Sequence, residues 1–353
     1  MKHSSKSNRC PRIGCQRLAL LAGLCVAAQA GWAATVVKDN NTDNLNLPTS
    51  WVGGVPPTSA DVAQWDNTVT GTNSVMLGAS TNWAGIKIID PGGPVTLEND
   101  GNTLTLGNSG IDLTAATNSL TINCPLTLQS TANTYWSLAG GQSLTINSAL
   151  KTVGNNYVIM GRYGTAGGTI NLTGGSAETP SVINNPDIRS LVTVNISGYL
   201  NINSGSLQKF DVSGGATVNW SATGTVTSSY GWYVGDGQSS GQTTLNISNG
   251  TMTVISGSHN GIAIGQPATV NVAGGNLVFG NNCNLYLGAS YNNGASGNHG
   301  VLTISSGLCD VGTSASGLFE IGKGAGGSGT INLDGGTLST MRSIMSAGTA
   351  QNG

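Results

Sequence analysis

The sequence predicts an all-β protein whose chain winds into a parallel β-solenoid of about ten coils behind an N-terminal cap. Three observations support this prediction. Glycine makes up 54 of the 353 residues, and glycine suits tight corners because it adopts positive φ without strain. Short phrases alternate polar and apolar residues, as strands with one buried face do. These phrases return at a nearly constant interval, which is typical of a repeat architecture.

Composition argues against several classes of protein. Charged residues make up only 8% of the chain, compared with about 25% in an average soluble domain. Lys and Arg number 13 against 15 Asp and Glu, so the chain lacks the basic footprint of a nucleic-acid-binding protein. Abundant β-branched residues and a small net charge argue against intrinsic disorder. We therefore expect no nucleic-acid partner.

Residues 1–33 are expected to be a secretory signal peptide, cut after Ala30 or Ala33. Five basic residues precede an apolar run from Leu18 to Ala28, and small residues follow it. The apolar run has about 11 residues, whereas a membrane helix needs about 20. No later stretch is long and apolar enough for a transmembrane segment. We therefore expect export to the extracellular space or to the outer surface of a bacterium.

Residues 35–100 are predicted to form an N-terminal β-rich cap, because they do not follow the repeat. They contain Trp51, Trp65 and Trp83 together with five prolines. The first coil of a solenoid has an open apolar end and exposed strand edges, so it needs an atypical covering segment. We expect the tryptophans to pack over this end rather than to form a platform for sugar rings.

Residues 101–353 are predicted to form the coils. The most regular phrase is Thr-x-Asn, and its asparagines Asn171, Asn195, Asn219, Asn246 and Asn271 lie 24, 24, 27 and 25 residues apart. A single coil cannot cover its own apolar side chains, but coils stacked about 4.8 Å apart bury a shared interior. An antiparallel sandwich is the rival architecture, with strands recurring every 8–12 residues or so. The solenoid is favoured because a unit of several different strands repeats here in fixed order.

Three features carry a resemblance to a known family: Asn44–Pro57 with Asp61–Trp65, Trp83–Val95 with Gly110–Thr114, and the Ile-Gly … Gly-Thr-Ile-Asn-Leu cadence of Glu320–Leu338. In these features the chain resembles the bacterial autotransporter-associated β-strand-repeat proteins, which are common in planctomycetes and verrucomicrobia. The resemblance covers essentially the whole mature chain and implies a right-handed parallel β-helix of the passenger type. It also implies an exported protein, displayed or secreted, with a structural or adhesive role.

The end of the sequence departs from this family pattern. Residues Met341–Gly353 show neither of the C-terminal anchoring devices that such proteins carry. We therefore expect either a short secreted form or a piece of a larger protein. An uncovered last coil exposes a strand edge, so we expect self-association through the C-terminal coil unless Met341–Met345 folds over it.

An enzyme on the same fold is the alternative hypothesis, because parallel β-helices also serve as polysaccharide lyases and hydrolases. Hydrolysis requires two facing carboxylates, and the nearest acid pairs in the sequence are Glu98/Asp100, Asp39/Asp43 and Asp61/Asp66. Residues one coil apart can also converge, which adds the pairs Arg162/Arg189 and Asp211/Asp236. No catalytic residue, cofactor site or metal site is predicted. Cys283 and Cys309 are the one cysteine pair that we would test for a disulfide.

The Thr-x-Asn phrases predict a regular outward-facing array. Its members are Thr169, Asn171, Thr193, Asn195, Thr217, Asn219, Thr244, Asn246, Thr269, Asn271, Thr330 and Asn332. Three roles are open for this face: a soluble uncharged surface with amide ladders, a contact with extracellular polysaccharide or a cell surface, and ice binding. The main hypothesis is an exported, non-enzymatic, adhesin-like or structural module, and the alternative is a polysaccharide-active lyase or hydrolase.

Overall fold

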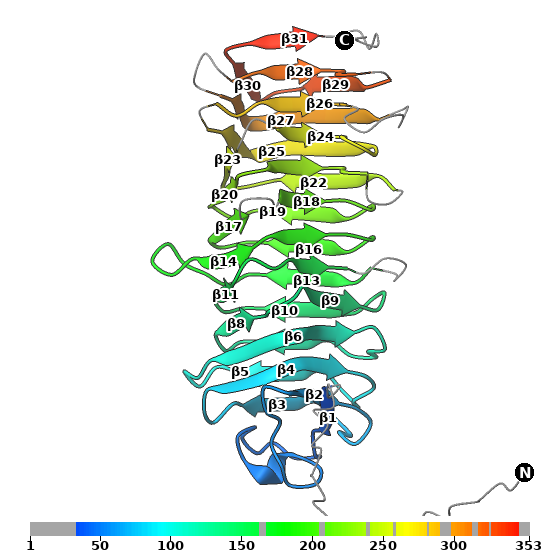
Figure 1. Ribbon diagram of the computed structural model, residues 1–353, viewed down its shortest axis with the longest axis vertical. Coiled ribbons are helices and arrows are strands. Elements are labelled where there is room, and N and C mark those ends of the chain that lie inside the picture. The colour runs from blue at the N-terminus through cyan, green and yellow to red at the C-terminus, as the bar shows by residue number, and fades with distance from the viewer. Residues whose placement is uncertain are drawn as a thin grey trace, which may run out of the picture. The chain divides into compact units, whose positions relative to one another are not determined.

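A computed structural model describes residues 33–161, 167–204, 209–237, 241–256, 259–280, 282–289, 298–312, 317–324 and 326–345. These residues wind into a β-solenoid of about 11 turns with almost no helix, and the strands of successive turns pair in parallel (Figure 1). The predicted all-β solenoid of about ten coils is therefore confirmed. Each turn contributes three strands, which stack on three faces that we call face 1, face 2 and face 3.

The faces contain the following strands. Face 1 consists of β3 (Asn73–Met76), β5 (Val95–Glu98), β7 (Leu120–Ile122), β10 (Ser143–Ile146), β13 (Thr169–Leu172), β16 (Thr193–Ile196), β19 (Thr217–Trp220), β22 (Thr243–Ile247), the first parts of β25 (Ala268–Phe279) and β27 (His299–Val311), and β29 (Ser328–Leu333). Face 2 consists of the first parts of β4 (Thr81–Ile88) and β6 (Leu104–Leu113), β8 (Leu126–Gln129), β11 (Leu150–Val153), β14 (Ser181–Asn184), β17 (Leu200–Ser204), β20 (Gly224–Ser228), β23 (Thr251–Ser256), the second parts of β25 and β27, and β30 (Thr337–Thr340). Face 3 consists of β1 (Ala34–Val37), β2 (Asp61–Trp65), the second parts of β4 and β6, β9 (Thr134–Leu138), β12 (Val158–Met160), β15 (Pro186–Ile188), β18 (Lys209–Val212), β21 (Gly231–Val234), β24 (Asn260–Ile262), β26 (Leu285–Leu287), β28 (Phe319–Ile321) and β31 (Ser343–Met345).

The two-residue alternation within each strand builds the interior. On β13, Ile170 and Leu172 are buried, whereas Thr169 and Asn171 lie half-buried on the outer side. The register places like residues above one another, so the aliphatic side chains of one coil cover those of the next. Burial of each such side chain contributes about 1.5–3 kcal/mol before chain entropy is counted. Stacking therefore supplies the core that no single coil has.

The segment between β1 and β2 closes the N-terminal end of the solenoid and includes a short helical turn, η1 (Pro48–Ser50). The rings of Trp51, Trp65 and Trp83 contact one another with centroids 5.8–6.3 Å apart, and each side chain is at most 2% exposed. The indole N–H of Trp51 donates to the Leu45 carbonyl at 2.8 Å. Because these rings are buried in the end of the core, they cannot stack on sugars.

Parallel pairing extends further toward the N-terminus than the predicted boundary at residue 101. β2 pairs with β4 and β3 with β5, and β5 continues face 1 beneath β7. The sequence concealed these coils because Ser74 and Thr96, rather than asparagine, occupy the aligned outer position. The atypical covering segment is thus shorter than residues 35–100.

Glycine is required at the corner that follows β26. Gly288 has a φ of +70°, and a Cβ at this position would collide with the Ser328 carbonyl of the next coil. Both the positive φ and the close approach of the backbone favour glycine over any residue with a side chain. In the sequence this corner follows an apolar-Gly phrase, Leu287-Gly288, which returns at Val234-Gly235 and Ile321-Gly322.

The C-terminal coil adds strands to all three faces without a covering segment among the described residues. β31 pairs in parallel with β28, so residues 343–345 continue face 3 rather than fold over the last coil. The side chain of Leu333 is 55% exposed, whereas Ile304, its aligned neighbour one coil earlier, is fully buried. Met341–Met345 therefore does not fold over the last coil, which was the condition under which self-association was not expected.

Candidate functional site

Five asparagines form a ladder along the outer side of face 1. Each Nδ2 group donates to the Oδ1 atom of the asparagine one coil earlier, at 2.8 Å in every step from Asn271 through Asn246, Asn219 and Asn195 to Asn171. Asn171 in turn donates to Thr145 Oγ1 at 3.0 Å. The side chains are half-buried between their neighbours. The ladder thus directs much of the amide hydrogen bonding along the stack rather than toward a ligand.

A row of threonines lies beside the ladder, two residues earlier in each strand. Its aligned members are Thr169, Thr193, Thr217, Thr244 and Thr269. The hydroxyl of Thr269 accepts a hydrogen bond from Gln242 Nε2 at 2.8 Å. Within the described part of the chain, the other four hydroxyls make no side-chain hydrogen bond. These hydroxyls are the groups of the predicted array that remain available to a partner.

Thr330 and Asn332 are aligned with this array but separated from it by one coil. That coil carries Val301 and Thr303 at the two outer positions. Asn332 Nδ2 donates to Thr303 Oγ1 at 3.3 Å, and Thr330 Oγ1 lies 3.2 Å from His299 Nε2. All twelve predicted residues therefore lie in register, with this one interruption.

A second polar ladder near the N-terminal end was missed in the sequence. Asn147 Nδ2 donates to Asn123 Oδ1 at 2.9 Å, and Asn123 Nδ2 donates to Glu98 Oε2 at 2.8 Å. Ser74 Oγ also donates to Glu98, and the hydrogen bonds from Ser74 and Asn123 hold the pKa of Glu98 below its usual value. Asn123 and Asn147 are 24 residues apart, the length of one coil, and this spacing could have revealed the second ladder in the sequence. Glu98 is thus the end of a ladder rather than half of a catalytic pair.

Two further acids of the N-terminal region, Asp61 and Asp43, stabilise local turns. Asp61 Oδ2 accepts hydrogen bonds from the backbone N–H and the hydroxyl of Thr58, at 2.9 and 2.6 Å. Asp43 Oδ2 accepts from Thr49 Oγ1 at 2.6 Å. Nearby threonines thus supply hydrogen bonds to both carboxylates, so a bound ligand is not needed to explain their presence.

Charged side chains gather on the outer side of face 3, where β15, β18 and β21 lie next to one another. Asp187 is aligned with Asp211 on the neighbouring strand. Arg189 forms a bidentate ion pair with Asp187. Lys209 Nζ lies 3.4 Å from Asp211 Oδ2 and also pairs with Asp236. We call these five residues the ionic cluster: Asp187, Arg189, Lys209, Asp211 and Asp236.

Burial dominates the electrostatics of the ionic cluster. The Asp211 side chain is fully buried, and burial raises its pKa to about 7; the Asp187 carboxylate adds to this rise and Lys209 opposes it. Burial likewise raises the pKa of Asp187, against the effect of Arg189. The pKa of the Tyr157 phenol is raised by burial and by the nearby charges of Asp187 and Asp211. A carboxyl group that titrates near neutrality is typical of acid–base sites and also of buried ion-pair networks.

The sequence pointed to part of this cluster. Asp211, Asp236 and Arg189 belong to the pairs expected to converge, but Asp187 and Lys209 were missed. Asp187 precedes Asp211 by 24 residues, and Lys209 precedes it by two, which places all three on the same outer side. Arg162, the remaining member of those pairs, lies outside the described residues.

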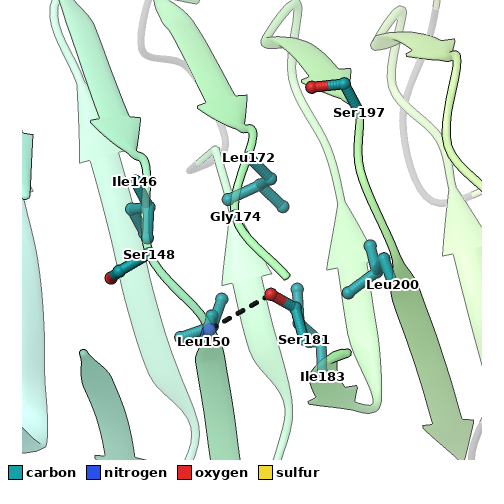
Figure 2. Close-up of a pocket in the computed structure, with 9 residues that line it drawn as sticks. All are labelled: Ile146, Ser148, Leu150, Leu172, Gly174, Ser181, Ile183, Ser197 and Leu200. Carbon is teal, nitrogen blue, oxygen red and sulfur yellow. Dashed lines mark hydrogen bonds between the residues drawn. The ribbon is translucent and has the colours of Figure 1, made fainter. Parts of the chain in front are cut away.

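A small pocket and an open groove are both lined by residues without titratable side chains. The pocket in Figure 2 encloses about 10 Å³ where faces 1 and 2 meet, and Ser181 Oγ accepts a hydrogen bond from the Leu150 N–H there at 3.1 Å. That volume suits about one water molecule. An open groove of about 320 Å³ beside β1 is lined by Thr35, Val36, Val37, Val52, Gly53 and Val55. It has no titratable side chain in its lining.

In the part of the chain that the structure describes, no three His, Cys, Asp or Glu residues gather in a way that could hold a metal ion. Cys124, Cys283 and Cys309 are all buried free thiols, so Cys283 and Cys309 do not form the disulfide considered above. Among the described residues, no helix has the length and apolarity that crossing a membrane requires.

Comparison with known proteins gives no assignment. No protein-family model matches the chain, and neither a curated protein nor a solved structure matches it. The function proposed below therefore depends on the geometry of this chain and on its sequence.

Proposed function

We propose that this protein is an exported, non-enzymatic β-solenoid module that serves a structural or adhesin-like role at a cell surface or in the extracellular space. The observation that carries the proposal is the Asn171–Asn271 ladder, in which the outer amides bond one another along the stack. Such a face rigidifies the solenoid and presents a repetitive, uncharged surface. A rigid stack with such an outer face suits a structural or adhesive role better than it suits catalysis.

The export part of the proposal rests on the sequence. Residues 1–33 have the basic start, short apolar run and small-residue exit of a secretory signal. The resemblance to autotransporter-associated β-strand-repeat proteins points to the same compartment. Fractionation of producing cells tests this proposal: we expect a shortened chain in the medium or on the outer surface. Retention of the full-length chain in the cytoplasm would contradict it.

The contact role is assigned to the threonine row. The hydroxyls of Thr193, Thr217 and Thr244 are aligned, half-exposed and without a side-chain partner among the described residues. We expect the mature protein to bind extracellular polysaccharide or whole cells, and replacement of these three residues by alanine to weaken that binding. Alanine at Thr105 and Thr127, which are aligned and half-buried on the outer side of face 2, provides the control.

Two experimental outcomes would change the role assigned to the threonine row. Equal loss of binding in the face 1 and face 2 variants would contradict a role for the threonine row. A freezing-point hysteresis in the purified protein, lost in the face 1 variant alone, would assign the row to ice instead.

A polysaccharide-active enzyme is the second candidate, and the ionic cluster is the observation that favours it. Three of the acids, Asp187, Asp211 and Asp236, gather around Lys209, and Asp211 has a pKa near neutrality. The test is release of reducing or unsaturated ends from pectin, alginate and chitin. Release that disappears in Asp211→Asn would support the enzyme and overturn the non-enzymatic proposal.

Self-association through the C-terminal coil stays a proposal. Leu333 is exposed at the described end of the stack, and Ile331 and Leu338 pack only partly against the core. Because an open strand edge can pair with another chain, we expect the apparent mass in light scattering to rise with protein concentration. Replacement of Leu333 by lysine should reduce that rise.

A further inference from the structure

The ionic cluster contains one more carboxylate than it contains cations. Arg189 pairs with Asp187, and Lys209 pairs most closely with Asp236, so these four residues form two ion pairs. Asp211 is the remaining acid, and its only ionic contact among the described residues is Lys209 Nζ, at 3.4 Å. The described groups therefore leave the charge of one carboxylate without a cation of its own.

Asp211 is also the least solvated member of the cluster. Its side chain is fully buried, and neither carboxylate oxygen has a hydrogen-bond partner with adequate geometry in the described part of the chain. Burying an ionised carboxylate without hydrogen bonds is costly, and the group avoids this cost by taking up a proton. The position therefore favours the neutral acid.

The groups that face Asp211 come from each neighbouring strand. Asp187 and Arg189 come from the β15 side, and Lys209 is on β18 itself. Tyr233 on β21 is aligned with Asp211, and Asp236 follows that strand. The Tyr157 phenol, which precedes β12, is close enough for the charges of Asp187 and Asp211 to affect it. No cation other than Arg189 and Lys209 acts on Asp211 among the described residues.

We propose that Asp211 is a proton-binding residue that makes the junction between the coils of β15, β18 and β21 sensitive to pH near neutrality. With the proton bound, the two ion pairs balance and the buried carboxyl group is neutral. When the proton leaves, Asp211 becomes a buried anion next to Asp187, and the two carboxylates repel each other across adjacent coils. This property is independent of any ligand and so goes beyond the proposed function.

The direction of the pH dependence follows from the raised pKa of Asp211, about 7 compared with 3.8 for an ordinary aspartate. The folded state holds this proton more tightly than the unfolded state does. The stability that the proton provides is complete in acid, is lost as the pH rises between about 4 and 7, and changes no further above that range. Within that window, one proton released on unfolding changes the unfolding equilibrium constant by about tenfold per pH unit.

The test compares the wild type with Asp211→Asn, which keeps the shape of the side chain and cannot ionise. Asp112→Asn is the matched control, because Asp112 also lies on the outer side of face 3 and hydrogen-bonds Thr114 locally. Unfolding by urea is measured from pH 5 to pH 8. We expect the wild type and the Asp112 control to lose stability relative to Asp211→Asn as the pH rises. Parallel profiles for the wild type and Asp211→Asn would overturn the proposal.

A second measurement on the wild type alone keeps the proposal testable if Asp211→Asn does not fold. Amide hydrogen exchange, corrected for the intrinsic effect of pH, reports the local opening of individual strands. We expect protection in β18 and β21 to fall between pH 5 and pH 8 while protection in β10 stays constant. Equal changes in β10 and β18, or no change in either, would overturn the proposal.

Discussion

The asparagine ladder predicts that the loss of stability on substitution depends on how many ladder hydrogen bonds the substitution removes. Asn219 donates to Asn195 Oδ1 and accepts from Asn246 Nδ2, both at 2.8 Å, so Asn219→Ala removes two hydrogen bonds. Asn271 donates one such bond to Asn246, and the next coil carries Thr303 at this position instead of asparagine. Asn271→Ala therefore removes one bond of the ladder. The two substitutions differ in ladder contacts but not in side-chain type.

The expected magnitude follows from the number of bonds and their exposure. A typical intramolecular hydrogen bond contributes about 0.5–1.5 kcal/mol. The ladder is half-buried, so water replaces part of what is lost. We expect Asn219→Ala to lower the free energy of unfolding by about 1–2 kcal/mol and Asn271→Ala by about half as much.

Tryptophan fluorescence provides the assay, because Trp220, on the same strand as Asn219, and the five other tryptophans of the described residues are buried. Urea unfolding is followed through this signal, and exchange of the β19 and β22 amides reports the local loss, since repeat proteins do not always unfold in one step. Thr217→Ala is the control, because its hydroxyl makes no side-chain hydrogen bond among the described residues. If Asn219→Ala costs no more than Thr217→Ala, the ladder does not stabilise the stack.

Two further predictions concern corners and thiols. Gly288→Ala should destabilise the protein by at least about 2 kcal/mol in thermal unfolding, since positive φ and a collision with the next coil both oppose a Cβ. Gly101→Ala is the control, because φ is +83° there and no atom lies within 4 Å of the added Cβ; it should cost about 1 kcal/mol. If Gly288→Ala and Gly101→Ala cost the same, the close approach of the Ser328 carbonyl to Gly288 does not matter. Burial raises the pKa of Cys124 and Cys309 to about 12, so neither should react with a thiol reagent at pH 8 until denaturant is added. Fast reaction of the native protein would contradict the packed interior.

The sequence was sufficient to predict the stack and the alignment of the outer array. The Thr-x-Asn phrase carries both the strand period and the coil period, so Asn171 and Asn195 could be placed one above the other before any coordinates. The N-terminal coils were harder to identify, because Ser74 and Thr96 replace the asparagine there. Thr121 and Thr145 replace the asparagine as well, but there the Ser-Leu-Thr-Ile phrase still repeats and shows the coils.

The ionic cluster could be predicted only in part, for a different physical reason. Face 3 strands are short and their outer residues vary, from Ile159 through Asp187 and Asp211 to Tyr233. The apolar-Gly phrase that ends several face 3 strands is also missing at the cluster, because Ile188 and Val212 are followed by Arg189 and Ser213. Ion pairing also depends on side-chain direction and burial, which spacing alone does not give. The sequence paired Asp211 with Asp236, but the acid aligned with Asp211 on a neighbouring strand is Asp187.

The one-coil step of the ladder has a mechanical consequence. Asn171, Asn195 and Asn219 are joined only through contacts along the stack, and 24 residues of chain separate each from the next. Tension applied to the two termini would peel the coils away in sequence, and each released coil would lengthen the tether by about 80 Å of extended chain. A stack of this kind would yield to a steady pull in many small unfolding events, each limited to about one coil, instead of unfolding all at once.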